Sequence, residues 1–241
     1  MFFLKNKIRS ILTTKNIRTT YDIFALQKLA GIVKNYIPWT SSSIRPSAIV
    51  KVINDIFLNK RENIIEFGGG MSTFYIAYAL KKNYGHLYTV EHDKNWIVIM
   101  KDILKKEHIE DVVTFIHAPL GNSTYSLNAL NWYSENALDA LSNCNKFDLV
   151  LVDGPFAHTK KLSLSRYPAI PFLMKKDKIS RNSTIILDDI YRNGEQTIVK
   201  KWGKEYGLKF TNLHEDGGIA ISNNGNFYNI SYYENSTYSR R

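Results

Sequence analysis

The sequence is poor in cysteine, proline and glycine, and it has no long apolar run. Its one cysteine, Cys144, cannot form an internal disulfide and excludes a zinc site built from several thiolates. Six prolines and 13 glycines among 241 residues exclude collagen-like repeats. No stretch reaches the roughly 18 apolar residues of a membrane span, and the first residues lack the small-residue cleavage site of a secretory signal. We therefore expect a cytoplasmic protein, since a reducing compartment suits so little cysteine.

Charge is distributed unevenly along the chain. Residues 1–61 hold eleven basic and two acidic residues, whereas residues 62–241 hold 21 basic and 20 acidic ones. We expect three parts: a basic helical extension over residues 1–61, a nearly neutral body over residues 62–222 and a polar tail over residues 223–241. A cationic extension attracts anionic partners, which are nucleic acid, anionic lipid or a phosphorylated acceptor.

The basic extension has helical periodicity. Among the first 18 residues, apolar positions recur at helical spacing between lysines and arginines. This pattern predicts either an interfacial helix that contacts a membrane surface or a terminal helix packed on the body. Residues 21–36 predict a second, core-packing helix that ends before Pro38, and residues 48–58 predict a third.

Strand-like and helix-like segments alternate after residue 61. Short runs of Ile, Val and Leu predict strands that are buried on both faces, and longer periodic stretches predict helices between them. The predicted strands are residues 63–67, 87–91, 112–117, 147–153, 184–188, 209–213 and 218–222, and the predicted helices are residues 72–82, 95–106 and 196–206. This order predicts an α/β fold with a seven-stranded, mostly parallel sheet and helices on both of its faces.

Unusual polar and glycine residues follow the carboxyl ends of these strands, where parallel sheets bind their ligands. They are Glu66 with Gly68, Gly69 and Gly70, then Glu91, His117, Asp153, and the pair Asp188 and Asp189. A glycine turn at the start of a helix lets the backbone approach a ligand and offers free N–H groups. A carboxylate at the end of the second strand can accept both hydroxyls of a ribose. We therefore expect a ligand that contains a nucleoside. Thr73 stands where the nicotinamide fingerprint requires a third glycine, which disfavours hydride transfer.

Four segments, IIEFGGGMST, LYTVEHD, FDLVLVDGP and STIILDD, resemble the class I S-adenosylmethionine-dependent methyltransferases, which have a Rossmann-like fold. Glu66, Gly68, Gly70 and Ser72 match the first motif of that family, acidic–x–G–x–G–x–[ST]. The resemblance covers about residues 62–222. It implies that the glycine loop holds the methionine part of S-adenosylmethionine and that Glu91 holds its ribose. It also implies that His117 and Ala118 lie beside the adenine.

The aspartates that follow the fourth and fifth predicted strands resemble one branch of that superfamily. Catechol-type O-methyltransferases place an Asp and an Asp–Asn pair at these points, where they hold magnesium. The resemblance implies a divalent-metal site at Asp153, Asp188 and Asp189, whose oxygens suit such a hard cation. Asp189 replaces the usual Asn, and the catalytic Lys of that branch is absent. His158 is the nearest candidate base, and the alternative to a metal is that Asp153 orients the substrate directly.

Shorter segments, APL with a following WY, VDGP, RYPA and DDIYR, resemble bacterial methyltransferases of sugar and surface-glycan biosynthesis. The resemblance implies O-methylation of a carbohydrate, a sugar nucleotide or another small anionic acceptor. Arg166 and Arg192 either clamp an anionic group or pair with the strand-end carboxylates, and Trp132 and Tyr133 either stack on a sugar or pack in the core.

Two further functions stay open on the sequence alone. The basic extension favours an RNA methyltransferase, although the aromatic loop that such enzymes use for flipped bases is missing after Asp153. The other is a non-catalytic Rossmann-like binding module.

Overall fold

The computed structural model describes residues 2–225 and 227–231, with the backbone alone for residues 2–15. Seven strands form one sheet in the order β3-β2-β1-β6-β7-β9-β8. They are β1 (Asn63–Phe67), β2 (His86–Glu91), β3 (Val113–His117), β6 (Phe147–Val152), β7 (Ile179–Leu187), β8 (Phe210–Leu213) and β9 (Ile219–Asn224). All pairs are parallel except those of β9 with β7 and β8. The predicted fold class is confirmed.

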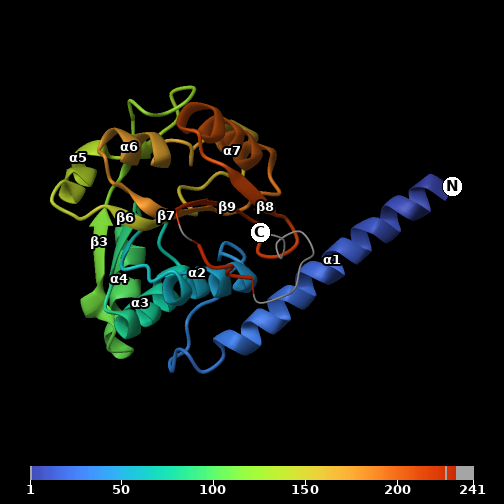
Figure 1. Cartoon of the computed structure of the whole chain (residues 1–241), viewed down its shortest axis with the longest axis horizontal. Coiled ribbons are helices and arrows are strands. Elements are labelled where there is room, and N and C mark those ends of the chain that lie inside the picture. The colour runs from blue at the N-terminus through green and yellow to red at the C-terminus, as the bar shows by residue number, and fades with distance from the viewer. Residues whose placement is uncertain (1, 226, 232–241) are drawn as a thin grey trace.

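Helices cover both faces of this sheet (Figure 1). They are α1 (Phe2–Leu29), α2 (Pro46–Leu58), α3 (Met71–Asn83), α4 (Lys94–Lys106), α5 (Glu135–Leu138), α6 (Ala169–Lys175) and α7 (Asn193–Tyr206). Three short 3₁₀ turns span Glu110–Val112, Asp139–Leu141 and Lys160–Leu162, and a small hairpin joins β4 (Leu120–Gly121) to β5 (Trp132–Tyr133). No helix of the described part of the chain is long and apolar enough to cross a membrane.

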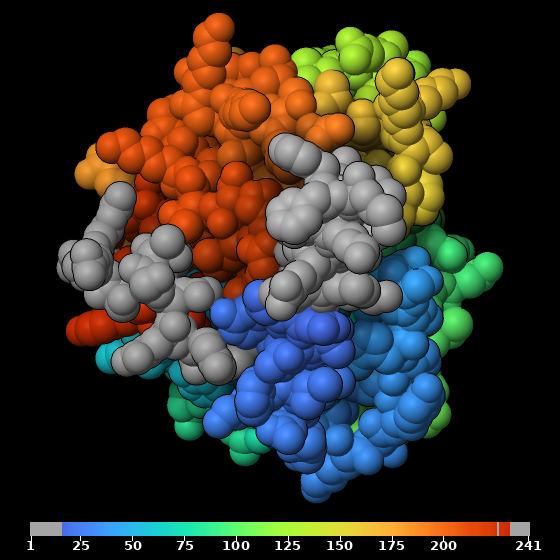
Figure 2. Space-filling model, turned by 90° about the vertical axis from the view of Figure 1, so that its right-hand side faces the viewer, coloured from blue at the N-terminus to red at the C-terminus, as the bar shows by residue number. Residues whose placement is uncertain are grey.

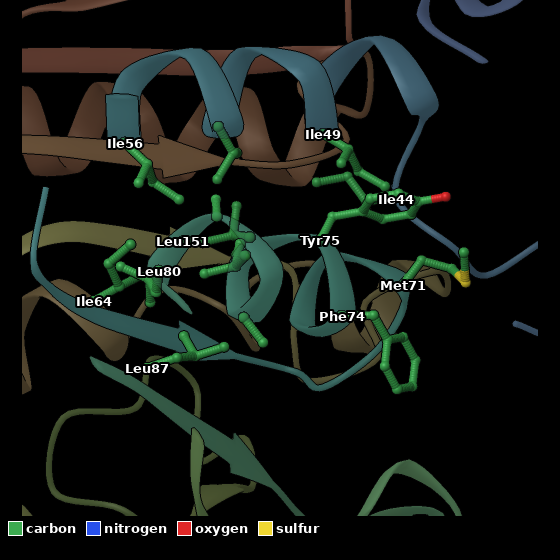
Figure 3. Close-up of a cluster of buried hydrophobic side chains, with 14 of the residues drawn as sticks. Ile44, Ile49, Ile56, Ile64, Met71, Phe74, Tyr75, Leu80, Leu87 and Leu151 are labelled. Atoms are coloured by element: carbon green, nitrogen blue, oxygen red, sulfur yellow. The ribbon is translucent and has the colours of Figure 1, made fainter. Parts of the chain in front are cut away.

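Two hydrophobic cores lie on the two faces of the sheet. In β6, Leu149 and Leu151 belong to the core under α2, α3 and α4, whereas Val150 and Val152 belong to the core under α6 and α7. Figure 3 shows part of the first core, with side chains of α2 and α3 meeting those of β1, β2 and β6. Because successive side chains of a strand point to opposite faces, burial on both faces requires an almost continuous apolar run.

The first helix differs from the prediction. One helix runs from Phe2 to Leu29, where the sequence predicts two, and it ends well before Pro38. Gly31 follows it with φ +80°, a left-handed conformation that glycine adopts at little cost and that terminates helices. Figure 1 shows the N-terminal half of α1 extending away from the sheet. The side chains of residues 1–15 lie outside the described residues, so the predicted membrane-surface contact is untested.

The second half of α1 and the connector that follows it are fixed to the body. Arg45 pairs with Asp22 of α1 at 3.0 Å and donates to the carbonyls of Arg18 and Glu215. Asp22 also accepts from the hydroxyl of Ser47, at the start of α2, at 2.6 Å. In Figure 2, the second half of α1 and the connector, in blue, pack beside the orange C-terminal part of the chain. These contacts hold residues 38–45 above the carboxyl ends of the strands.

The predicted polar tail begins as part of the fold. Asn223 and Asn224 belong to β9, and the carbonyl of Ile230 accepts from the side-chain amide of Asn54 at 2.9 Å. Ile230 is itself buried in the core that α2 covers. Residues 226 and 232–241 lie outside the described residues.

Candidate active site

The glycine loop after β1 packs backbone to backbone against the loop after β6. Gly68 has φ +93°, and a Cβ atom on it would lie 2.7 Å from the amide nitrogen of Gly154. The N–H of Gly154 donates to the carbonyl of Phe67 at 2.6 Å, and that of Gly68 donates to the carbonyl of Val90 at 2.9 Å. Only glycine fits at residue 68, because both the conformation and the contact exclude a side chain.

Glu66 lies beneath this loop and holds it in place. Its buried carboxylate accepts hydrogen bonds from the hydroxyls of Ser72, Thr73 and Thr89. Burial raises the pKa of Glu66 to about 7, although the three hydroxyls oppose this rise. Glu66 and Ser72 do not line the cavity described below. They join the end of β1 to the first turn of α3 and so position the glycines between them.

Glu91 ends β2 and reaches the same loop. Its Oε2 accepts from the N–H of Gly69 at 3.0 Å, and its Oε1 accepts from the N–H groups of His92 and Asp93 at 2.7 and 2.8 Å. Burial opposes the charged form, but these bonds and the imidazole of His92, 2.8 Å away, outweigh it and lower the pKa of Glu91. Gly69 in turn accepts from the indole N–H of Trp96 at 2.9 Å. An ionised carboxylate is therefore fixed beside the glycine loop.

A cavity of about 450 Å³ opens above these strand ends. It brings together eleven of the site residues predicted from the sequence. They are Gly68, Gly69, Gly70, Glu91, Tyr133, Asp153, His158, Arg166, Asp188, Asp189 and Arg192. Their presence around one cavity, from separate segments of the chain, makes it the candidate active site.

Carboxylates and guanidinium groups alternate on one wall of the cavity. Arg166 lies between Asp153, at 3.1 Å, and Asp189, at 3.0 Å, and Arg192 pairs with Asp189 at 2.7 Å. Glu195 lies behind both arginines, 3.7 Å from Arg166 and 3.6 Å from Arg192. The arginines thus form ion pairs within the fold, which was one of the two roles left open by the sequence.

Ionisation within this wall is strongly perturbed. Burial raises the pKa of Asp153, and the charge of Asp189 adds to this rise while that of Arg166 opposes it. Burial also raises the pKa of Asp188 well above its usual range, helped by the charges of Asp153 and Asp189. Burial raises the pKa of Glu195 to about 7. Burial opposes the charged form of Arg166, but the surrounding carboxylates outweigh it and raise its pKa. Groups with such shifts, gathered in a cavity, are typical of active sites.

His158 stands at the edge of this wall. Its ring stacks on Phe156 at 4.6 Å between centroids, and its Nε2 lies 2.9 Å from a guanidinium nitrogen of Arg192. Because Arg192 can only donate, Nε2 is the acceptor. Partial burial and the charge of Arg192 lower the pKa of His158, so the ring is neutral near pH 7.

Besides Glu66 and Ser72, three predicted site residues do not line this cavity. Trp132 packs in the core against Phe67 and Phe172, with centroids 5.6 and 5.5 Å away, and does not line the cavity. His117 and Ala118 do not line it either; the N–H of Ala118 donates to the carbonyl of Glu91 at 2.9 Å. Tyr133 is as buried as Trp132, yet it reaches the cavity wall, and its hydroxyl has no hydrogen-bond partner among the described residues.

Several cavity residues carried no clear signal in the sequence. The connector 40–45, with four hydroxyl side chains in a row, forms a rim of the cavity, although it lies between the predicted helices and shows no periodicity. Phe156 and Tyr191 also line it, with 53% and 45% of their surfaces exposed. A large exposed aromatic ring is visible only once the fold is known. His92 and Trp96 also line the cavity, and their position one and five residues after Glu91 is a signal that the sequence does contain.

Two features define the methyltransferase class of α/β proteins. One is the strand order with the single antiparallel strand β9, and the other is a cavity where the glycine loop meets an acidic strand end. Comparison with family models agrees, since the model described as "Methyltransferase domain" matches residues 65–190. The chain belongs to this family. No curated protein sequence matches it significantly.

Solved structures share the fold at low sequence identity. The SAH-bound methyltransferase PaMTH1 of Podospora anserina has a TM-score of 0.57 and 13% identity, over 92% of this chain and 96% of that one. An O-methyltransferase from Bacillus cereus, in complex with SAH, has a TM-score of 0.54 and 16% identity, over 85% and 90% of the two chains. The O-methyltransferase TomG from Streptomyces achromogenes, in complex with SAM, has a TM-score of 0.50 and 17% identity, over 73% and 79%.

Proposed function

We infer that this methyltransferase uses S-adenosylmethionine to methylate a hydroxyl group of a carbohydrate, a sugar nucleotide or a similar small anionic acceptor. One observation carries the inference: the glycine loop and Glu91 lie in the same cavity as Asp153. The first two suit the donor, and the third suits an acceptor hydroxyl.

The donor side of the cavity is the junction of β1 and β2. Glu91 is held ionised by its backbone donors, and a carboxylate in this position accepts hydrogen bonds from the two ribose hydroxyls of a nucleoside. The loop consists of three glycines without side chains, so the methionine part can approach its backbone. The sulfonium charge of the donor suits a cavity lined by the ionised carboxylate of Glu91 and by Asp153.

The acceptor side is formed by the connector and the loop after β6. Hydroxyls of Thr40 to Ser43 and the carboxylate of Asp153 offer hydrogen-bond partners for a polyhydroxylated molecule. The exposed rings of Phe156 and Tyr191 offer apolar faces against which a sugar ring can pack. The net charge of +10 attracts an anionic acceptor such as a sugar nucleotide. The resemblance of VDGP and DDIYR to glycan enzymes favours surface-glycan biosynthesis as the setting.

Methyl transfer is a direct displacement at carbon. S-adenosylmethionine, held by the glycine loop and Glu91, would supply its methyl group to the acceptor oxygen and would keep the electron pair of the broken carbon–sulfur bond as a neutral thioether. The hydroxyl proton passes to the carboxylate of Asp153, which Arg166 orients from 3.1 Å. We assign this role to Asp153 rather than His158, because Nε2 of His158 already accepts from Arg192. The cavity contributes chiefly by holding the two reactants in line.

Replacement of Glu91 tests the donor site. The Glu91→Gln variant keeps the shape of the side chain but loses its charge. We expect the affinity for S-adenosylmethionine to fall about 10- to 100-fold, since a hydrogen bond to a charged group contributes about 1.5–3 kcal/mol. Isothermal titration calorimetry measures this change. Glu107→Gln, directly after the C-terminal end of α4 and outside the cavity lining, is the matched control and should leave the affinity unchanged. Equal affinities of Glu91→Gln and the unaltered protein would refute the assignment.

A transfer assay tests the acceptor class. Donor with a radiolabelled methyl group is incubated with sugar nucleotides, neutral oligosaccharides, a catechol and total RNA in parallel. We expect label in the carbohydrate samples, as an ether that resists mild base. Label in RNA alone, with transfer falling steeply as salt rises, would instead identify an RNA methyltransferase. Binding of the donor without transfer to any sample would favour the binding module.

A further inference from the structure

A guanidinium group lies among the carboxylates that the catechol-type resemblance assigns to magnesium. The ligand oxygens of Asp153, Asp188 and Asp189 all lie within 4.8 Å of one another, a spacing that suits a metal ion. However, the two terminal nitrogens of Arg166 contact two of these three side chains, Asp153 at 3.1 Å and Asp189 at 3.0 Å. One positive charge thus already bridges the ends of β6 and β7.

Three of the about four lone-pair sites of the Asp189 carboxylate are already used. Its Oδ2 accepts from both Arg166 and Arg192, and its Oδ1 accepts from the hydroxyl of Tyr191 at 2.6 Å. A divalent cation needs carboxylate oxygens that point at it without competing donors, and it is repelled by a guanidinium a few ångströms away. The donor set of this wall therefore does not fit a resident magnesium ion.

Arg166 is built into this position. It is 2% exposed, its Nε donates to the carbonyl of Pro155 at 3.3 Å, and Nη1 donates to the carbonyl of Asp188 at 3.4 Å. A buried guanidinium with all these partners cannot swing away without leaving its charge and theirs uncompensated, which is strongly unfavourable. A metal ion would have to displace it.

We propose that Arg166 takes the place of the divalent cation, so that Asp153 and Asp189 are bridged by a guanidinium and the site works without a metal. The role of Arg166 is positioning: it fixes the carboxylate of Asp153 toward the cavity. The proposal rests on the proposed methyl transfer only in the test that measures the transfer rate; the metal-binding tests do not depend on that function.

Metal binding to the unaltered protein is the first test. The protein is dialysed against EDTA and then titrated with MnCl₂ by calorimetry, and its melting temperature is measured with and without MgCl₂. We expect no saturable Mn²⁺ binding below about 1 mM and no rise in melting temperature. Stoichiometric Mn²⁺ binding that Mg²⁺ displaces, and that Asp188→Asn abolishes, would overturn the proposal.

Two substitutions of Arg166 form the second test. Arg166→Met removes the charge while keeping much of the volume, and Arg166→Lys keeps the charge. We expect the Met variant to bind Mn²⁺ at least tenfold more tightly than the unaltered protein and to melt at a higher temperature when Mg²⁺ is present. The Lys variant should do neither. A folded Met variant with no gain in Mn²⁺ binding, or equal gains in both variants, would contradict the proposal; should the Met variant fail to fold, the titration of the unaltered protein decides.

Chelation gives the kinetic test. The transfer rate should be the same with and without EDTA, and a rate lost to EDTA and restored by Mg²⁺ would overturn the proposal. An absence of transfer under both conditions counts against the proposed function, and the binding measurements still decide the role of Arg166.

Discussion

Substitution of Gly68 by alanine is expected to lower the melting temperature by roughly 5–15 °C and to abolish donor binding. A Cβ on this residue would lie 2.7 Å from the backbone nitrogen of Gly154 and 2.9 Å from its Cα. The neighbour is backbone and cannot rotate away, so the two loops must separate. The left-handed conformation adds about 1–2 kcal/mol and the overpacking about 1–3 kcal/mol. Thermal melting and calorimetric titration with S-adenosylmethionine measure the two effects.

Gly207→Ala is the matched control for this experiment. Gly207 ends α7 with φ +69°, a left-handed conformation like that of Gly68, but nothing lies within 4 Å of its potential Cβ. Its replacement should therefore cost only the conformational part, about 1 kcal/mol, and leave donor binding intact. Equal destabilisation by both substitutions would show that the contact with Gly154 contributes nothing.

Substitution of Asp153 by asparagine is expected to reduce kcat about a thousandfold while donor affinity changes less than threefold, within the range of 10²–10⁴ that general-base catalysis contributes. Asparagine fills the same space and still accepts a hydrogen bond from Arg166, but it cannot take up the acceptor's proton. Steady-state transfer rates and donor titration, measured on the same preparation, separate the two quantities. A variant that keeps more than a tenth of kcat would remove Asp153 from the mechanism.

Glu195→Gln provides the comparison within the same group of charges. Glu195 is fully buried and lies near both arginines, but it does not line the cavity. Its replacement changes the local charge without removing a group that can contact the reactants, so kcat should fall less than tenfold. A fall as large as that of Asp153→Asn would mean that the total charge of the wall, rather than a proton acceptor at Asp153, controls the rate.

The sheet and its strand ends were accessible from the sequence because their causes are local. Runs such as Phe147–Val152 must be apolar at every position to be buried on both faces, and polar residues directly after them must lie at the ligand edge of a parallel sheet. Glu91 and Asp153 were located in this way. The predicted helix over residues 21–36 extends too far, because the helix ends at Leu29 and Gly31 adopts a left-handed conformation. The apolar periodicity continues past Gly31, so the sequence alone did not indicate that the helix ends there.

The remainder of the site depends on contacts between distant segments. Whether Arg166 binds a ligand or pairs with Asp189 is decided by the placement of the segment before α6 beside the residues that follow β7, 23 positions later in the chain. Trp132 and Tyr133 are neighbours in β5, so their opposite directions follow from the strand pleat, but which one reaches the cavity depends on the face that β5 presents. The connector at residues 40–45 has no periodicity at all.

The rim of the cavity at residues 40–45 precedes the stretch that defines the family, residues 65–190. Part of the proposed acceptor side thereby lies outside the stretch that holds the glycine loop and Glu91. On the proposed function, we expect exchanges in the short linker before α2 to change the affinity for the acceptor while Gly68 and Glu91 still bind the donor.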